Sequence, residues 1–474
     1  FEENTGYQDT YQDFEKDGKA KPLYDDHFHR QLSFRIDKNG SDGAIHTFQA
    51  GVKDLKFGGG WFNYEDLAPF DKKVTSHFQN YTYLKSDGLF KTRRFQIYHN
   101  YVDYNAILFN APANPLELVT LDWSFRDQRI DMEFQENQIW SPDLQTVWGL
   151  GYRYELSDSI GWLAEDHHSR NSYRIFGHLE YNLTESLILN AGGFAEDHED
   201  IGNNISPRLA LNYRINNQHT LRTSLSRAYR MPSFYAQYAD QTIESVVIPG
   251  LGLPQTLGDN NINPEEMTSF EIGYLGRFFE NKLELDIRLA HEKIDQIIDR
   301  TKTERNIYRS DPFNLYRFNF FSYGQVDLES AEVQLNYKPS KKTFLNFYIS
   351  LTNTDGYRAD SLDLNKQPFN KEYLDDHVPY KTIGALISHK PLPDLRLSMQ
   401  YNYVDAYSSE GDGSNLDRFE SLDLKFTKEI STEKGEKLEF SGIVRNVSDN
   451  PYQDFEDDNF VGLDTYFQVK LSLN

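Results

Sequence analysis

Apolar and polar residues alternate one by one along most of the chain. In the segment KLELDIRLA (282–290), aliphatic residues occupy every second position and charged residues lie between them. A period of two places the aliphatic residues on one face of a β-strand, whereas a helix would scatter them around its axis. The same alternation recurs at 173–181, 220–226, 331–337, 344–350, 395–401, 422–426 and 467–473.

The pattern predicts about 19 long strands. Segments 91–111 and 116–139 are each interpreted as one strand. The connections between strands alternate in length. Short connections contain Asn, Asp, Pro and Lys, which are common in hairpin turns, and lie at 215–218, 278–281, 339–342 and 391–394. Long connections lie at 157–171, 230–268, 293–325, 353–378, 403–417 and 448–464.

Alternating short and long connections are typical of a transmembrane β-barrel, which has short periplasmic turns and long extracellular loops. We therefore predict an all-β fold, an antiparallel transmembrane β-barrel in which apolar residues face lipid and polar residues face the lumen. Tyrosines near strand ends are expected to form the interfacial girdle, among them Tyr152, Tyr154, Tyr401 and Tyr403.

Strand parity gives a further expectation. Residues 1–26 carry eight acidic and three basic side chains and are interpreted as the remnant of an extracellular loop, so the barrel is expected to occupy 27–474. The first strand (27–37) and the last (464–473) would both run toward the periplasm. The total number of antiparallel strands from the first to the last is therefore odd. Closed bacterial outer-membrane barrels have an even number. If the parent barrel has 22 strands, the size of plugged transporters, about three precede Phe1.

Composition excludes several functional classes. The formal net charge is 49 − 73 = −24, which argues against a nucleic-acid partner. Cysteine is absent, so disulfides, cysteine zinc sites and thiol catalysis are excluded. No run of about 18 apolar residues exists, so no transmembrane helix is expected. The chain opens with Phe1 and shows no basic-then-apolar leader, which suggests a mature or truncated product.

Four segments carry a family resemblance in the expected order along the chain. They are TVWGLGYRY (146–154), SPRLALNYRINNQHTLRTSLSRAYRMPS (206–233), INPEEMTSFEIGYLG (262–276) and FSGIVRNVSDNPYQDF (440–455). The second contains a Ser-Pro-Arg strand and an aromatic-Arg-x-Pro box, and the third a Pro-Glu…Glu-x-Gly box. Together they resemble the TonB-dependent outer-membrane receptors. The final residues, Leu473 and Asn474, depart from the aromatic C-terminus usual in outer-membrane barrels.

The resemblance implies energy-dependent uptake of a scarce, bulky nutrient across the outer membrane of a Gram-negative bacterium. A ferric siderophore is the default ligand, and cobalamin, an oligosaccharide or a copper chelate remain open. The implied partners are a TonB-type energy-transducing complex, acting through an N-terminal plug not in this chain, the chelate itself, and outer-membrane lipid and lipopolysaccharide. No cofactor is implied.

Three other functional classes compete with active transport. A passive outer-membrane porin is the main alternative. A soluble glycan-binding β-protein would need polar outward faces, which the alternating segments do not provide. An outer-membrane enzyme would need a catalytic constellation, yet neither a nucleophile elbow nor an HExxH motif occurs. The chain is therefore predicted not to be an enzyme and to have no catalytic or metal-ligating residues.

Candidate ligand contacts are predicted in three long connections. In GWLAEDHHSRN (161–171), Trp162, His167 and His168 are candidates; the adjacent histidines contact either a metal chelate or solvent, and solvent is favoured because two residues cannot complete a coordination sphere. Tyr235 and Tyr238, which follow the aromatic-Arg-x-Pro box, are candidates for contact with a ligand above the plug. Arg230 lies in the box and Arg227 lies just before it. The two arginines predict either a charge network in the lumen or contacts with an anionic ligand, and the network is favoured.

The third candidate segment, 301–320, is basic and aromatic in an acidic chain, and its candidates are Arg305, Tyr308 and Arg309. Such residues attract an anionic chelate through charge and cation–π contacts, or lie against lipopolysaccharide phosphates. Haem receptors of the family carry a His between the two boxes. The interval 233–262 holds none, which counts against haem.

Overall fold

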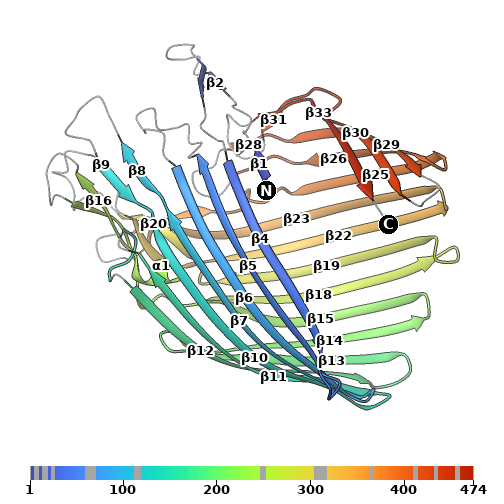
Figure 1. Cartoon of the computed structure of the whole chain (residues 1–474), viewed down its shortest axis with the longest axis horizontal. Helices are drawn as coiled ribbons and strands as arrows, with labels where there is room; N and C mark the ends of the chain where they lie inside the picture. The colour runs from blue at the N-terminus through green and yellow to red at the C-terminus, as the bar shows by residue number, and fades with distance from the viewer. Residues whose placement is uncertain are drawn as a thin grey trace.

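Alternating residues fold into β-strands throughout the computed structural model of the chain (Figure 1). The structure describes residues 2–4, 10–12, 20–22, 27–58, 71–110, 119–159, 161–165, 167–245, 252–303, 318–362, 368–408, 415–431, 436–453 and 460–472. Within these ranges, no helix has the length and apolar character needed to cross a membrane.

The described residues contain the expected 19 long strands. They are β4 (His27–Asn39), β5 (Ile45–Gly58), β6 (Asp71–Asp87), β7 (Lys91–Asn105), β10 (Phe125–Ser141), β11 (Leu144–Asp158), β12 (His167–Asn182), β13 (Leu187–His198), β14 (Gly202–Asn216), β15 (His219–Arg230), β18 (Glu265–Phe278), β19 (Leu283–Asp295), β22 (Gly324–Ser340), β23 (Thr343–Leu362), β25 (Lys381–Leu392), β26 (Leu395–Val404), β29 (Phe419–Ser431), β30 (Lys437–Arg445) and β33 (Asp464–Ser472). Each pairs antiparallel with the next along the chain, so together they form a curved barrel wall.

Short elements lie at the end of this wall opposite the short turns, some of them in separate two-stranded sheets. They are β1 (Glu2–Asn4), β2 (Thr10–Gln12), β3 (Ala20–Pro22), β8 (Ile107–Asn110), β9 (Val119–Asp122), α1 (Phe234–Tyr238), β16 (Asp240–Ser245), β17 (Gly252–Leu257), β20 (Ile298–Thr303), β21 (Phe318–Ser322), β24 (Pro368–Tyr373), β27 (Tyr407–Ser408), β28 (Asn415–Leu416), β31 (Tyr452–Gln453) and β32 (Phe460–Val461). The predicted long connections therefore contain much additional strand. β17 pairs with β21, and β20 with β23, in parallel, which are exceptions to the antiparallel order.

Segments 91–111 and 116–139 are not single strands, contrary to the sequence interpretation. The first divides at Ala106 into β7 and β8, and the second divides at residues 123–124 into β9 and β10. The backbone N–H of Trp123 still donates to the Ala106 carbonyl at 2.8 Å. The two segments therefore remain hydrogen-bonded to each other where their strands are interrupted. Alternation continues through such an irregularity, which is why the sequence does not reveal it.

The apolar face of the wall points outward. Trp148, Leu150, Tyr173 and Ile175 lie on neighbouring strands β11 and β12 and are 41–58% exposed. The described interior holds no large hydrophobic core; the largest fully buried side chains are Gln237, Asn319, Asn446, Thr256, Pro232 and Ser172. Exposed apolar strands around a polar interior are expected of a barrel in lipid and opposite to a soluble β-protein.

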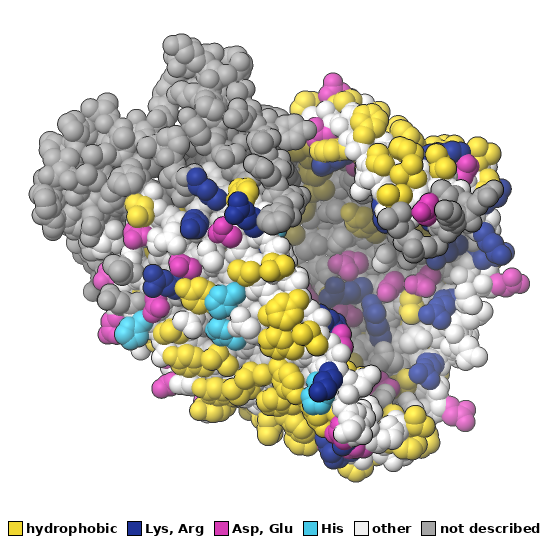
Figure 2. Space-filling model, viewed as in Figure 1, with side chains coloured by type: hydrophobic (Ala, Val, Ile, Leu, Met, Phe, Trp, Pro, Cys, Tyr) yellow, Lys and Arg dark blue, Asp and Glu magenta, His cyan; other side chains and the backbone are white. Residues whose placement is uncertain are grey.

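The described wall has a seam between β4 and β33. Registers join β4 to β5 and β1, and they join β33 to β30, whereas none of the described registers joins β33 to β4. Because the long strands are odd in number and antiparallel, β4 and β33 run in the same direction. Figure 1 shows β4 and β33 apart from each other, and Figure 2 shows a hollow on this face of the molecule.

Candidate ligand-binding site at the barrel mouth

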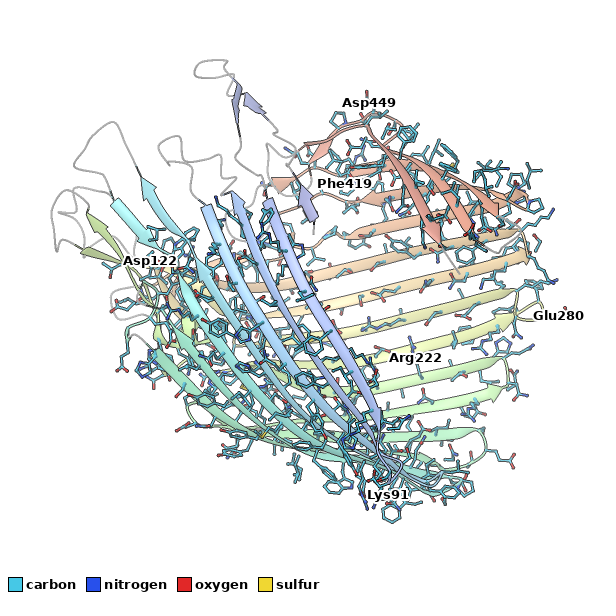
Figure 3. The ribbon with its side chains drawn as sticks, in the orientation of Figure 1. Lys91, Asp122, Arg222, Glu280, Phe419 and Asp449 are labelled. Atoms are coloured by element: carbon cyan, nitrogen blue, oxygen red, sulfur yellow. The ribbon has the colours of Figure 1, made fainter. Side chains whose placement is uncertain are left out.

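A cavity of about 730 Å³ lies on the lumen side of the wall, at the end that carries the long connections. Side chains of β7, β10, β11, β12 and β13 and of the segment after β15 line it. In Figure 3, Asp122 marks this end of the barrel, whereas Lys91 and Glu280 mark the short-turn end. A ligand arriving over the long connections therefore meets this cavity first.

Acidic and basic side chains form a ladder on the lumen face of β10, β11 and β12. Arg129 Nη2 lies 2.6 Å from Glu155 Oε1, and Arg153 Nε lies 2.9 Å from Asp131 Oδ2. Arg174 also contacts Asp131. Since each guanidinium has a carboxylate partner, the wall offers ordered hydrogen-bonding groups with little net charge.

An aromatic group stands above this ladder. The rings of Trp162 and Tyr235 are 4.7 Å apart, and both residues line the cavity. The ring centroid of Phe125 lies 6.1 Å from that of Trp162. The rings of Phe320 and Tyr235 meet edge-on, with centroids 5.1 Å apart. The buried Nε1 of Trp162 has no hydrogen-bond partner among the described residues. Two predicted contacts from different connections thus share one wall of the cavity.

Arg170 holds the segment that carries Tyr235. It is 4% exposed, and its Nε and Nη2 donate to Asp200 at 2.8 Å each. Its other bonds run to the Pro232 carbonyl, at 3.2 Å, and to Gln237 Oε1, and its Cζ lies 4.6 Å from the ring centroid of Phe234. The side chain therefore fastens α1 to the inner wall of β12.

Local chemistry explains why α1 starts where it does. Ser233 is the N-cap, and its Oγ accepts from the Ala236 backbone N–H at 3.1 Å. Such a cap satisfies one of the free N–H groups of a first helical turn. A helix of five residues is not stable by itself, so its contacts with the wall determine its position.

The two adjacent histidines point to opposite sides of the wall. Successive residues of a strand alternate faces, and exposed His167 shares the outward face with Tyr173. His168 lies on the lumen face, stacked on Tyr238 with ring centroids 4.0 Å apart. The imidazoles therefore do not converge on one ligand.

Tyr238 contacts the wall and does not line the cavity. Its hydroxyl donates to Asp200 Oδ2 at 3.3 Å. Burial, followed by the nearby charge of Asp200, raises the pKa of Tyr238. The phenol therefore stays protonated at neutral pH and serves as a donor to Asp200.

Arg227 and Arg230 are both ion-paired, but on opposite faces. Arg230 lines the cavity and pairs with Glu265. Arg227 Nε lies 3.0 Å from Glu266 Oε1. The alternation of β15 places Arg227 outward with Leu225, which is 52% exposed, so the predicted lumenal network includes Arg230 and not Arg227. Arg305, Tyr308 and Arg309 lie outside the described residues.

Sequence reasoning missed the cavity floor. His198 is 4% exposed and lines the cavity; its Nε2 lies 2.9 Å from Glu196 Oε2. Its Nδ1 is buried and has no hydrogen-bond partner in the described part of the chain. The alternation of β12 and β13 indicates that Arg170 and His198 face the lumen, but not which residues meet them. Among described residues, no group of three or more His, Asp or Glu could hold a metal ion.

Comparisons with known proteins agree with this architecture. The model of the family described as TonB dependent receptor-like, beta-barrel matches residues 3–473. A mutant of the ferric enterobactin receptor of Pseudomonas aeruginosa superposes with a TM-score of 0.72 at 12% identity, covering 98% of this chain and 72% of that one. The search of curated proteins gave no match.

Two further solved structures share the fold. The siderophore receptor PiuA of Acinetobacter baumannii gives a TM-score of 0.68 at 10% identity, covering 94% of this chain and 74% of that one. The copper transporter OprC gives 0.70 at 12% identity, covering 95% and 72%. At such low identity, these similarities establish the fold and not the ligand.

Proposed function

The chain belongs to the TonB-dependent receptor β-barrel family, and from this premise we propose that it takes up a bulky metal chelate, by default a ferric siderophore. Members of this family are outer-membrane β-barrel proteins that act as active-transport receptors and interact with TonB, and the family is not one of enzymes. The chelate class is supported by fold relatives that include a ferric enterobactin receptor and a copper transporter.

One observation carries the proposal: the mouth cavity combines an aromatic wall with a polar floor. Trp162 and Tyr235 offer ring faces to the organic shell of a chelate. Arg129, Arg153 and Glu155 of the ladder, which line the cavity, offer hydrogen-bonding groups. A volume of about 730 Å³ falls in the range of small-molecule sites.

The test uses ferric enterobactin as probe, with a copper chelate and ferric citrate for comparison. Binding to the purified protein is measured by quenching of tryptophan fluorescence. Trp162→Ala and Tyr235→Ala should each weaken binding at least about tenfold, because truncated aromatic anchors lose most of their buried contact. Phe279→Ala is the matched control: this aromatic residue is 69% exposed at a short turn and should change nothing.

Uptake into cells separates the proposal from its alternative. A receptor of this kind should accumulate the labelled chelate only with a functional TonB, whereas a passive porin would admit it without TonB and in proportion to concentration. Uptake that is independent of TonB would contradict active transport by this chain. Binding of none of the three chelates would contradict the chelate as ligand.

We further propose that additional strands close the seam between β4 and β33. Antiparallel closure requires an odd number of them, and three would give the 22 strands of plugged transporters. A plug that contacts TonB would then precede them, and the outward apolar face would contact lipid and lipopolysaccharide. Sequencing the gene upstream of the Phe1 codon tests this arrangement, and a leader joined directly to Phe1 would refute it.

A further inference from the structure

Seven short elements at the long-connection end are joined in one continuous order. β8 pairs with β9, β9 with β16, β16 with β17, β17 with β21, and β21 with β20, while α1 directly precedes β16. We call these seven elements the strap. One end of the strap continues into β7 and β10, and the other end pairs with β23. Figure 1 shows β8, β9, β16, α1 and β20 together at this end of the barrel.

The strap crosses the mouth of the barrel and does not follow its rim. Four strands, β11 to β14, stand between β10 and β15 in the wall. Neighbouring strands are about 4.8 Å apart, so β10 and β15 are separated by roughly 24 Å along the wall. β9, which leads into β10, nevertheless pairs directly with β16, which follows β15 and α1, and Thr120 lies opposite Glu244. The strap is therefore a chord across the mouth, and the mouth cavity lies between this chord and the wall of β10 to β13.

The strap contains several of the most deeply buried side chains among the described residues. Thr256 on β17, Thr301 on β20 and Asn319 on β21 are 0%, 3% and 1% exposed. Directly after β17, a Cβ at Gly258 would stand 2.4 Å from the carbonyl oxygen of Gln237 in α1. Closely packed segments transmit a displacement to their neighbours, whereas segments with few buried contacts open locally. The strap therefore belongs to the stable part of the mouth.

Further contacts fasten the strap between its two ends. Leu163, in the connection from β11 to β12, forms an antiparallel bridge with Ala239 at the end of α1, and the two residues are 6% and 4% exposed. Backbone hydrogen bonds of 2.8 and 2.9 Å lie on either side of this bridge. Arg170 joins α1 to β12. Movement of the strap away from the wall would break these contacts together with the pairing of its strands.

Other hairpins at the same end of the barrel are built differently. β2–β3, β27–β28 and β31–β32 each form a separate two-stranded sheet, and none of the described registers joins them to the strap. Figure 1 shows β2, β28 and β31 away from β9 and β16. A hairpin of two strands is only marginally stable by itself. In the described part of the chain, the mouth therefore has one braced side and one side of separate hairpins.

We propose that the strap stays closed throughout uptake, and that a ligand reaches the mouth cavity from the side of the β2–β3, β27–β28 and β31–β32 hairpins. A lid that opens needs a few hinge residues that absorb the movement. The strap is instead held at both ends and bridged to the wall in the middle. The inference rests on the proposed function, because it concerns the route of the transported chelate.

A disulfide across the bridge tests the proposal on the full chain. The chain contains no cysteine, so Leu163→Cys with Ala239→Cys introduces the only two thiols. The flanking hydrogen bonds make this a non-hydrogen-bonded antiparallel pair, whose Cα atoms are about 4.5 Å apart, within the range that a disulfide spans. Oxidation therefore locks the strap to the connection from β11 to β12, and a reductant releases it. Intact mass after thiol alkylation measures how much of the protein is locked.

Uptake of labelled ferric enterobactin is compared between the oxidised and reduced forms of this one variant, in cells with a functional TonB. Both forms lack the same two side chains, so a difference between them comes from the lock. The chain without cysteine, treated with the same oxidant and reductant, is the control. The locked form should take up the chelate as fast as the reduced form. Loss of uptake that the reductant reverses would overturn the proposal, and so would a folded variant that forms no disulfide.

Hydrogen exchange of the chain without cysteine gives a second readout, which does not depend on transport. Amides of β17 and β21 should exchange as slowly with ferric enterobactin as without it, and more slowly than those of β27 and β28. Exchange in the strap as fast as in β27 and β28, or faster exchange once the chelate is added, would overturn the proposal even if the cysteine variant does not fold. If this chain takes up no chelate, the proposed function fails, and exchange in the strap still decides the inference.

Discussion

Replacing Arg170 by Met should release α1 from the barrel wall. The substitution removes the three bonds to Asp200, the bond to Gln237 and the bond to the Pro232 carbonyl, while keeping an unbranched side chain in the space. Arg170 is 4% exposed and Gln237 is 2% exposed, so Asp200 loses its ion-pair partner and Gln237 Oε1 loses its donor. Removing one member of a buried ion pair costs about 3–5 kcal/mol.

The local opening of 231–241 should lose a similar amount, because the bonds of Arg170 to the Pro232 carbonyl and to Gln237 join that segment to β12, and hydrogen bonds to a charged group are worth about 1.5–3 kcal/mol each. An opening free energy reduced by about 3–5 kcal/mol speeds amide exchange roughly 10² to 5 × 10³-fold. Hydrogen exchange with mass spectrometry measures it, with β18 and β19 in the same sample as internal reference. Arg170→Met combined with Asp200→Asn should restore part of the protection, since no unpaired charge remains.

A surface pair provides the control. Arg35 and Asp37 form an exposed ion pair with side chains 59% and 48% accessible, and Arg35→Met should leave exchange unchanged throughout. Unchanged exchange in 231–241 of the Arg170 variant would refute the assigned role of this side chain. Faster exchange everywhere in the barrel would show instead that Arg170 supports the whole wall.

Two further substitutions test the wall itself. Gly324→Ala should lower the stability of the folded barrel by at least about 2 kcal/mol, because Gly324 has φ +111° and a Cβ would stand 2.2 Å from the Tyr357 carbonyl oxygen. The control is Gly88→Asn, at φ +70° in open space. Equal urea midpoints of the two variants would contradict the argument. Asp131→Asn should cost about 1–3 kcal/mol by leaving Arg153 and Arg174 without their shared carboxylate; an unchanged urea midpoint would show that lumen water screens the pair.

The strands were predictable because alternation is a local property. Leu283 to Leu289 were expected on one face, and β19 spans Leu283–Asp295 with Leu289 51% exposed and Ala290 buried. The side-chain period of two follows from backbone geometry alone, and so does the assignment of each residue to one face or the other. The same local rule places Arg227 and Arg230 on opposite faces of their strand, and it separates His167 from His168 in the same way.

The cavity was not predictable in this way. Trp162 and Tyr235 were named from separate connections, and their meeting depends on how each connection folds over the barrel mouth. Arg170, Asp200 and His198 were missed, because single charged or polar residues in strands carry no signal about their partners. His198 becomes notable through its burial and its free Nδ1, which are properties of packing.

The sequence by itself determined the strands, their two faces and the family, since side-chain alternation and short motifs are written within a few consecutive residues. Tertiary structure alone decided which residues form the mouth cavity and how α1 is held. Arg170 bonds Asp200 and Gln237, which are 30 and 67 residues away along the chain. Such separations are spanned by the curvature of the wall and the path of the connections, and neither is encoded in local periodicity.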